Sequence, residues 1–236
     1  MSKKGGSIHK KRLNTSTITV LEKRKGHKWI VGTRPGPHNK EKSVPLAVIL
    51  RDSLKIAKTN KEAKKLIKEK KILVDGKEVK DHKLPIGLMD IISLTEENKH
   101  YRFYLNKNIK LVPKEINEKN AKMKLEKVVK KNKIKNNKIT ISLHDGKTII
   151  ADNNIKNGDT IILSLVDKKI NGILKLENGA KCYIMDGKHT GKIGELKEIV
   201  KTETSKQKIA KLDVEGEEII TVAKYLFVIN NDWVNE

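Results

Sequence analysis

Cysteine and aromatic residues are scarce in this sequence. Cys182 is the only cysteine among 236 residues, which excludes a disulfide within the chain and a zinc site built from several thiolates. We interpret it as a small apolar residue of a strand. Aromatic residues make up 3% of the chain, so nucleic-acid binding by base stacking along an aromatic platform is not expected. The seven histidines form no H-x-x-x-H pair and have no accompanying carboxylate cluster, so we predict neither a metal site nor a cofactor.

Long hydrophobic runs are missing as well. No segment approaches the roughly 18 apolar residues of a membrane-spanning helix, and none predicts a long helix with a basic face and exposed bulky apolar residues. The N-terminal segment carries positive charge without the apolar centre of a secretory signal. Together with the single cysteine, these absences predict a cytoplasmic protein without a membrane partner.

Positive charge is abundant and unevenly distributed. The chain has 52 Lys and Arg residues against 29 Asp and Glu residues, a formal net charge of +23. The net charge is +10 over residues 1–43, +5 over 44–106, +9 over 107–174 and −1 over 175–236. Such a concentration predicts a polyanionic partner. Phosphate contacts and shape recognition of folded RNA suit a basic chain that is poor in aromatic residues.

Residues 44–94 predict two helices followed by a small sheet. Pro45 suits the first turn of a helix, where its missing N–H costs nothing. Thr59 and Glu62 form a T-x-x-E capping box at the start of the second helix. Asp75 and Gly76 are typical of a tight turn between two strands. The apolar residues at helical spacing are Leu46, Ile49, Leu50, Leu54 and Ala57 in the first helix, and Ala63, Leu66 and Ile67 in the second.

Four lysines share the other side of the second helix, since Lys61, Lys64, Lys65 and Lys68 are three and four residues apart. One interpretation is the ordinary solvation of an amphipathic helix. The other, favoured by the charge of the whole chain, is a surface that binds RNA phosphates. The pattern L-x-x-x-L-x-x-A-x-T-x-x-E-A-x-x-L-I-x-x-x-x-I-L-V-D-G-x-x-V resembles the S-four-type RNA-binding module. That resemblance implies that the second helix and the following turn contact the RNA backbone.

Residues 1–43 predict a basic arm, because they cannot form a core alone. Residues 15–22 are compatible with a strand. The sequence R-P-G-P-H over residues 34–38 fixes an extended, kinked path, since proline locks φ and restricts its neighbour. A disordered tail is the alternative. Rigid prolines and a tryptophan are unusual in such a tail, so we expect an arm that becomes ordered against RNA and the following module.

Residues 106–172 predict a domain of short strands. Asn117 is expected to cap a short helix that leads into a strand. Turns are expected at Asp-Gly, residues 145–146, and at Asn-Gly, residues 157–158. Alternating residues around these turns are typical of a small β-barrel or sandwich. The basic run over residues 130–135 is expected either to touch RNA or to be merely solvated.

Residues 173–236 predict a second small barrel. Its G-x-x-x-G-x-x-G pattern, formed by Gly187, Gly191 and Gly194, allows positive φ and a tight corner. The pattern resembles the KOW motif of small barrels in ribosomal and transcription-elongation proteins. That resemblance implies that the loop lies near RNA or a protein partner. Because this segment has no net positive charge, we expect protein packing combined with RNA contact at Lys188, His189 and Lys192.

The order of these parts is more specific than any single motif. A basic arm with P-G-P-H, an S-four-type module with G-L-M-D, the segments L-H-D-G-K-T-I and N-G-D-T-I, and a KOW loop together resemble the S-four-e family of small-subunit ribosomal proteins of archaea and eukaryotes. The resemblance covers nearly the whole chain. It implies an α+β, mostly β protein with four parts: a basic N-terminal arm (1–43), an αα-β RNA-binding module (44–105), a central β-barrel-like domain (106–172) and an SH3-like KOW barrel (173–236).

Membership of this family implies a non-catalytic scaffold, with small-subunit ribosomal RNA and neighbouring ribosomal proteins as partners and without a small-molecule substrate. The expected turn glycines are Gly76, Gly146, Gly187, Gly191 and Gly194. The expected RNA contacts are His9, Lys10, Lys11, Arg12, Lys23, Arg24, Lys25, Lys28, Arg34, His38, Lys58, Lys61, Lys64, Lys65, Lys68, Lys188, His189 and Lys192.

Two other classes of protein can carry similar parts. A pseudouridine synthase or an RNA methyltransferase can contain an S-four-type module, but it also needs a catalytic domain, and the sequence after Asn106 shows only short hairpins. The G-K-T at residues 146–148 resembles the end of a P-loop, but Ile141 occupies the position of a required glycine, so a nucleotide site is rejected. A KOW-type transcription or translation adaptor is the other alternative, and it would copurify with RNA polymerase.

Overall fold

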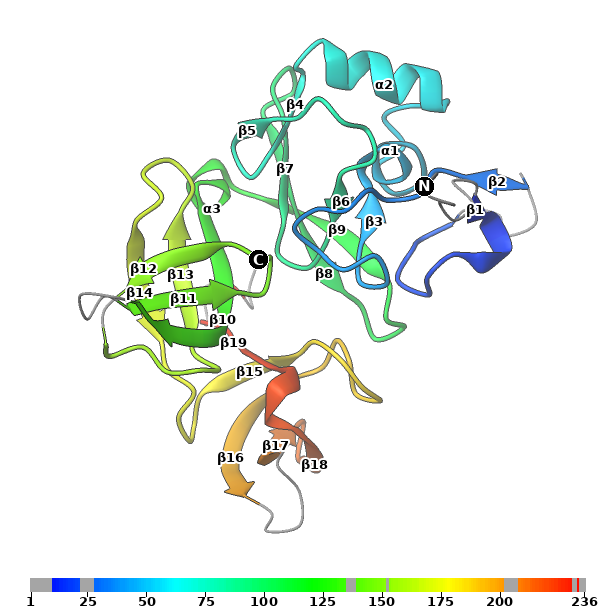
Figure 1. The fold of residues 1–236 in the computed structure, drawn as a ribbon. Coiled ribbons are helices and arrows are strands. Elements are labelled where there is room, and N and C mark those ends of the chain that lie inside the picture. Colours follow the sequence, from blue (N-terminus) through cyan, green and yellow to red (C-terminus); the bar gives the residue numbers. More distant parts are fainter. Residues whose placement is uncertain are drawn as a thin grey trace, which may run out of the picture. The chain divides into compact units, whose positions relative to one another are not determined.

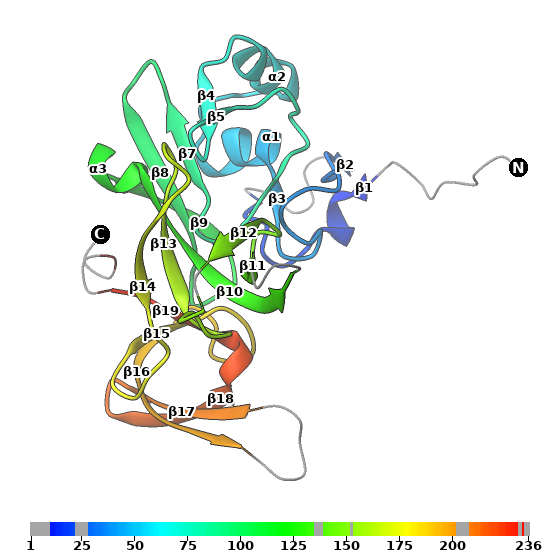
Figure 2. The same cartoon turned by 60° about the vertical axis from the view of Figure 1, so that its left-hand side comes forward.

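The computed structural model of the chain describes residues 10–21, 28–134, 139–151, 153–201, 208–230 and 233. The chain divides into two compact units, which we call the first unit (Met1–Tyr104 and Lys110–Lys114) and the second unit (Leu105–Ile109 and Glu115–Glu236). Both are built mostly of short strands with a few short helices (Figure 1 and Figure 2), so the expected α+β, mostly β fold is confirmed. In the segments that the structure describes, every helix is too short or too polar to cross a membrane.

The first unit is built around a five-stranded sheet in the order β5-β4-β7-β8-β9. Two further antiparallel pairs join β1 to β2 and β3 to β6. Strand bounds are β1 Lys10–Lys11, β2 Trp29–Ile30, β3 Val44–Pro45, β4 Ile72–Val74, β5 Lys77–Glu78, β6 Pro85–Ile86, β7 Ile91–Leu94, β8 Lys99–Leu105 and β9 Leu111–Ile116.

The predicted first helix consists of α1 (Leu46–Val48) and a π-helical turn, Ile49–Ser53. Most of its apolar face is buried. The helix ends earlier than predicted, because Lys55 has a positive φ of 56° and the following N–H groups bond to the carbonyl of Leu50. Ala57 is therefore buried from a loop, not from the helix.

The second helix, α2 (Asn60–Lys68), forms as its capping signals predict. The N–H of Glu62 donates to Thr59 Oγ1 at 3.2 Å, and the N–H of Lys58 donates to Glu62 Oε2 at 2.9 Å. Both bonds satisfy N–H groups that a helix start leaves without a partner. The predicted apolar face is buried except for Leu66, which is half-buried.

A tight turn joins β4 to β5, as predicted. Asp75 and Gly76 have φ values of 48° and 70°, the conformation of a type I′ hairpin turn. Asp75 also accepts a hydrogen bond from the N–H of Ile91 at 3.1 Å, which ties the hairpin to β7.

The prediction of a strand over residues 15–22 is wrong for residues 15–21, the part of this segment that the structure describes. Residues 17–19 lie in a turn, in which the N–H of Thr19 donates to the carbonyl of Ser16 at 3.1 Å. Ile18 is buried, and its carbonyl accepts a hydrogen bond from the N–H of Leu111 in β9. The β-branched residues of this segment favoured a strand, but the fold uses Ile18 as an isolated anchor.

Within its described residues, the second unit contains two five-stranded sheets, in the orders β12-β11-β10-β13-β14 and β18-β17-β16-β15-β19. The strand β10 pairs with β13 in its first half and with β11 in its second half, and its register shifts between Val128 and Lys130. A bulge of this kind bends a strand. Strand bounds are β10 Met123–Lys133, β11 Ile139–Leu143, β12 Thr148–Ala151, β13 Thr160–Ser164, β14 Ile170–Leu174, β15 Lys181–Ile184, β16 Ile193–Lys201, β17 Lys208–Val214, β18 Glu217–Val222 and β19 Leu226–Val228.

The local signals in this unit are also confirmed. A short helix, α3 (Glu118–Ala121), leads into β10 as predicted, although Asn117 makes no side-chain capping bond. The predicted turns before β12 and β13 contain Gly146 and Gly158, with φ values of 82° and 100°.

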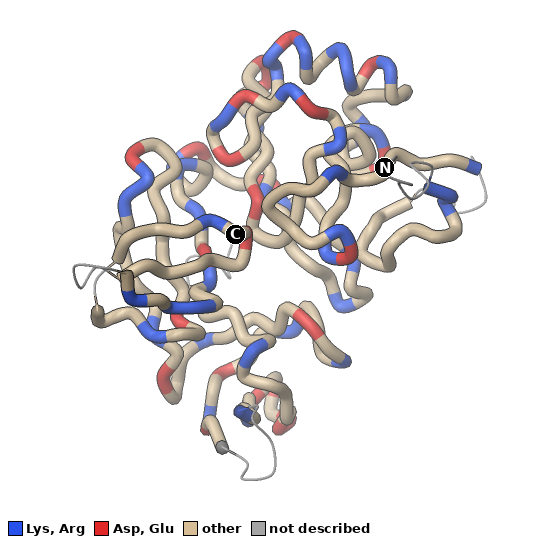
Figure 3. The backbone as a smooth tube through the Cα atoms, viewed as in Figure 1, with Lys and Arg blue, Asp and Glu red and all other residues tan. Residues whose placement is uncertain are grey.

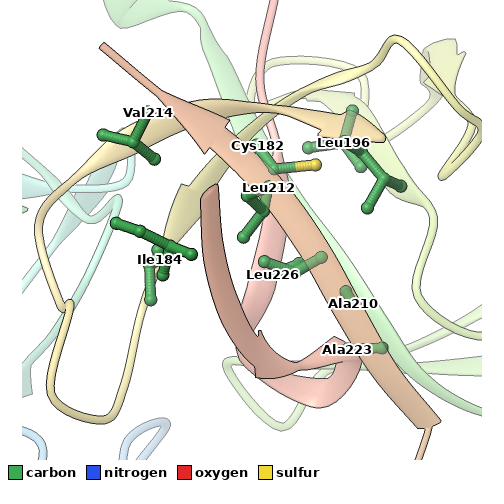
Figure 4. Packing of buried hydrophobic residues seen from close by; sticks show 10 residues of the cluster. Cys182, Ile184, Leu196, Ala210, Leu212, Val214, Ala223 and Leu226 are labelled. Carbon is green, nitrogen blue, oxygen red and sulfur yellow. The ribbon is translucent and has the colours of Figure 1, made fainter. Parts of the chain in front are cut away.

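A hydrophobic core lies within the sheet that contains β15. Figure 4 shows Ile184, Leu196, Leu212 and Leu226 gathered around Cys182. Cys182 is fully buried, and this burial raises the pKa of its thiol to about 12. It therefore serves as a small apolar residue of a strand, as predicted.

Candidate nucleic-acid interface

The predicted lysine face lies on the solvent-exposed side of α2. Lys61, Lys64, Lys65 and Lys68 are all exposed, and Figure 3 shows basic positions repeated along this helix. Among the described residues, no carboxylate lies within ion-pair distance of Lys61, Lys64 or Lys68, whereas Lys65 reaches Glu69 at 3.7 Å. Three ammonium groups thus remain available to an external anion.

A shallow hollow of about 650 Å³ runs between these side chains. The two acidic residues at its edge are already engaged. Glu62 caps the helix, and Glu69 is 2.9 Å from the ammonium of Lys71, which is the main cause of the lowered pKa of the Glu69 carboxyl. The hollow therefore presents net positive charge. It is lined by Thr59, Lys61, Glu62, Lys64, Lys65, Lys68 and Glu69.

Positive charge continues from α2 to Arg34 of the arm. The guanidinium of Arg34 is 3.0 Å from Asp81, and its side chain remains 66% exposed. His82, which follows Asp81 in the chain, has a lowered pKa. Its partial burial is the main cause, and the positive charges of Lys64 and Arg34 contribute as well. Arg34 and Lys64, two predicted RNA contacts that are distant in sequence, therefore both lie near enough to His82 to lower its pKa.

Two predicted RNA contacts of the arm, Arg12 and His38, are buried instead. Arg12 is 5% exposed and lies 3.9 Å from Asp52. The Nε2 atom of His38 lies 2.8 Å from Asp90, and its side chain is 6% exposed. Neither side chain is accessible to a phosphate, so both predictions are corrected to a structural role, in which the arm is held by the buried contacts of Arg12 with Asp52 and of His38 with Asp90. The sequence alone does not indicate that Arg12 lies beside Asp52 or His38 beside Asp90, because each partner is distant in the chain.

The remaining arm residues differ in exposure. Lys11 and Lys28 are exposed, whereas Lys10 is half-buried, and the pKa of Lys10 is lowered by burial and then by the charge of Lys40. Lys58, just before α2, is exposed. The predicted contacts His9, Lys23, Arg24 and Lys25 lie outside the described residues.

The P-G-P-H and G-L-M-D segments interlock, which sequence reasoning missed. A Cβ atom on Gly36 would lie 2.6 Å from the Pro85 ring, and one on Gly87 would lie 2.5 Å from Cγ of the His38 ring. Asp90 contacts both segments. Its carboxylate lies beside His38 and also accepts a hydrogen bond from the N–H of Gly87 at 2.8 Å. The glycines in both motifs were the only signal that two chain segments approach so closely.

The glycine-rich loop between β15 and β16 forms a compact turn. Gly187 and Gly191 have φ values of 92° and 85°, as predicted. Gly194 does not need positive φ and is required for a different reason, since its Cβ would lie 2.5 Å from the Asp213 carbonyl oxygen. Of the predicted contacts on this loop, Lys188 is exposed, and His189 and Lys192 are half-buried.

The middle glycine of this loop packs against the chain itself. A Cβ atom on Gly191 would lie 2.7 Å from the backbone of Asn106. Nearby, the hydroxyl of Tyr183 accepts a hydrogen bond from the N–H of Leu105 at 2.9 Å and donates to the Leu105 carbonyl. Gly191 is therefore required by the close approach of residues 105–106, and the nearness of this loop to RNA or a protein partner remains a prediction.

The basic run at the end of β10 remains partly available. Lys130 and Lys133 are exposed. The ammonium of Lys131 instead donates to the carbonyl of Asn153 at 2.6 Å. At least one lysine of this run is thus used within the fold.

Buried ionic groups in the second unit hold its strands. Lys124 and Glu126 are fully buried and lie 3.6 Å apart, and Asp145 is 3.7 Å from Lys124. Lys147 lies 3.0 Å from Glu126 and also contacts Asp145. Burial raises the pKa of Glu126 to about 7. Burial also opposes ionisation of Asp145, but Lys124 and Lys147 outweigh it and lower its pKa to about 2.

Comparison with known proteins identifies the class first. A model of the S4 domain matches residues 44–92, the segment that carries α1, α2 and the β4–β5 hairpin. The chain is therefore an S4-domain protein.

The rest of the chain identifies the family. The model described as ribosomal family S4e matches residues 97–170. Small ribosomal subunit protein eS4 of Methanosphaera stadtmanae is 37% identical over 232 residues, covering 98% of this chain and 96% of that protein. The protein of the same name from Nanoarchaeum equitans is 40% identical over 201 residues, covering 85% and 86%. The crystal structure of 30S ribosomal protein S4e from Thermoplasma acidophilum is 34% identical, with a TM-score of 0.70 over 81% of this chain and 96% of that one. The chain belongs to the S4e family of ribosomal proteins. Members of this family are structural components, and the protein is not an enzyme.

Proposed function

We propose that the protein is a scaffold of the small ribosomal subunit in the cytoplasm, which binds small-subunit ribosomal RNA through the lysine face of α2. The observation that carries this proposal is the exposure of four lysines on one helix face, three of them without an ion-pair partner among the described residues. The names of the relatives support the small subunit as the site of assembly.

The mechanism is neutralisation of phosphates by the lysine ammonium groups. Each phosphate contact releases condensed counterions, so affinity falls as salt rises, with a slope that grows by about one for each contact. Lys58 extends this surface at the start of α2, and the exposed Arg34 is a further contact of the first unit. The cap at Thr59 stabilises the start of the helix, so that the backbone positions of the four lysines are ordered before RNA binds.

The other parts of the chain have supporting roles in this proposal. Residues 1–43 act as a basic arm, residues 44–105 as the RNA-binding module, residues 106–172 as a barrel-like domain and residues 173–236 as an SH3-like KOW barrel. The exposed Lys188 supports an RNA contact of the glycine-rich loop, with His189 and Lys192 beside it. Neighbouring ribosomal proteins are the expected partners of the remaining surface.

Charge reversal on α2 tests the proposal. The variant K61E/K64E/K65E/K68E should lose most of its affinity for small-subunit RNA, and its slope of log affinity against log salt should fall by up to about four. The matched control K119E/K156E/K168E/K169E makes the same change of net charge at exposed lysines of the second unit. It should bind nearly as the unchanged protein does.

Filter binding at several salt concentrations gives both quantities, and sucrose gradients of assembled subunits test incorporation. Glutamate at position 65 would repel Glu69 one helical turn away. A second variant, with glutamine at the same four positions, therefore separates loss of binding from loss of the helix, and circular dichroism checks the fold. If the α2 variants bind and assemble as well as the control, the proposed role of this face is wrong.

A further inference from the structure

Trp29 is a large apolar side chain that the fold leaves half exposed. It lies on β2 and is 50% exposed, whereas its neighbour Ile30 is 8% exposed. Successive side chains of a strand point to opposite faces. The pair of strands β1 and β2 therefore packs inward through Ile30 and directs the indole outward, although tryptophan is on average a well-buried residue.

Two cations flank the indole. Lys11 is directly opposite Trp29 in the β1–β2 ladder, and side chains directly opposite each other lie on the same face of a sheet. Lys11 is also exposed. The ammonium of Lys28 lies over the ring of Trp29, 5.1 Å from its centroid, a distance at which the ring attracts a cation. An aromatic surface bordered by positive charge has the chemistry to bind one nucleotide, base and phosphates together.

The two strands are held in place by buried contacts. The N–H of Arg12, which follows β1, donates to the carbonyl of Lys28 at 2.9 Å. The buried guanidinium of Arg12 lies 3.9 Å from Asp52, in the π-helical turn of the first helix. The indole is thus presented from an anchored position, which lowers the entropy cost of binding a partner.

We propose that Trp29 stacks against one unpaired base of the RNA, while Lys11 and Lys28 bind the phosphates beside that nucleotide. The inference rests on the proposed RNA-binding function and adds recognition of an unpaired base to a surface that otherwise senses charge and shape. The low aromatic content argues against a platform of several rings, not against a single ring. A protein occupant fits less well, because charged residues are depleted in the cores of protein interfaces.

Substitution of Trp29 in the full chain separates stacking from charge. Against small-subunit ribosomal RNA, Trp29→Ala should weaken binding by about 5- to 100-fold, the effect of losing one base–aromatic stack. Trp29→Phe should restore most of the affinity. The salt slope of Trp29→Ala should equal that of the unchanged protein, whereas the double variant Lys11→Ala/Lys28→Ala should lower it by about two. On a fully paired RNA duplex, Trp29→Ala should bind as the unchanged protein does.

Fluorescence gives a direct readout, because the other tryptophan can be removed. In a Trp233→Phe background, emission comes from Trp29 alone. Small-subunit RNA should quench this emission and protect it from acrylamide, and the paired duplex should do neither.

The outcomes are distinguishable from those for α2. Undiminished RNA affinity of Trp29→Ala, together with loss of binding in the α2 variant, overturns the stacking inference and leaves the proposed function standing. Undiminished RNA affinity with poor incorporation into subunits assigns Trp29 to a protein neighbour and also overturns the inference. If neither the Trp29 nor the α2 variant changes RNA binding, both proposals fail.

Discussion

Gly87 allows a quantitative test of how the arm is held in the first unit. An alanine Cβ at this position would lie 2.5 Å from Cγ of the His38 ring. The ring cannot easily move away, because it is almost fully buried and lies 2.8 Å from Asp90. The backbone at Gly87 does not have the positive φ that penalises alanine. The steric conflict with His38 is therefore the main cost of the substitution.

Overpacking of this kind lowers the free energy of unfolding by about 1–3 kcal/mol. Gly→Ala also restricts the unfolded chain, which contributes about 0.4–1 kcal/mol in the stabilising direction. We expect Gly87→Ala to destabilise the first unit by about 1–2 kcal/mol as the balance of the two effects. In a His38→Ala background the ring is absent, and the same substitution should be neutral or stabilising by up to about 1 kcal/mol.

Urea unfolding of the four proteins in this double-mutant cycle measures the coupling between positions 38 and 87. Trp29 fluorescence in a Trp233→Phe background reports on the first unit, because Trp233 belongs to the second. Gly32→Ala is the matched control, since its Cβ would have no neighbour closer than 3.9 Å among the described residues and its φ is not positive. An equal cost of Gly87→Ala with and without the His38 ring would refute the interlock.

Two further predictions concern stability. The folded-state pKa of Glu126, about 7, lies above its ordinary value of 4.5. The folded state therefore favours the protonated form of this carboxyl. The contribution of Glu126 to the free energy of unfolding should be lost as pH rises from 4.5 to 7. The loss amounts to up to about 3 kcal/mol. Urea unfolding across this range should show it in the unchanged protein relative to Glu126→Gln, and parallel pH profiles would contradict the assignment. Thr59→Ala should destabilise the first unit by about 1 kcal/mol, because α2 loses its cap. Thr59→Ser should not do so, and Asn117→Ala, at an N-cap without a side-chain bond, is the control in thermal unfolding.

Features encoded in short stretches of sequence were predictable. The α2 helix depends on Thr59, Glu62 and an apolar stripe within ten residues, so its start, cap and lysine face followed directly from local patterns. The turn at Gly76 was predictable for the same reason, since positive φ at two successive positions is characteristic of an Asp-Gly hairpin. Such signals do not depend on the rest of the fold.

Features created by distant contacts were not predictable. The basic character of Arg12 and His38 predicts RNA contacts, yet each side chain lies beside a carboxylate that belongs to the following module. The apolar pattern around Ile18 favoured a strand, but pairing requires a neighbour that only the tertiary structure supplies. Gly191 followed the expected glycine pattern, while the segment that approaches it closely, residues 105–106, lies far away in sequence.

The exposure of Trp29 was not predictable for a different reason. The average aromatic content of a chain contains no information on which aromatic side chain stays exposed. The alternation of Trp29 and Ile30 on a paired strand determines that exposure. Position in the fold therefore decides the role of a rare residue.

The division into two units has a consequence for biosynthesis and for experiments on fragments. The chain passes from the first unit to the second after Tyr104, returns at Lys110, and leaves again after Lys114. A polypeptide released at residue 104 would lack all of β9, which forms one edge of the five-stranded sheet of the first unit. A nascent chain can therefore complete its first unit only after residue 114 has left the exit tunnel, and no single cleavage yields both units intact.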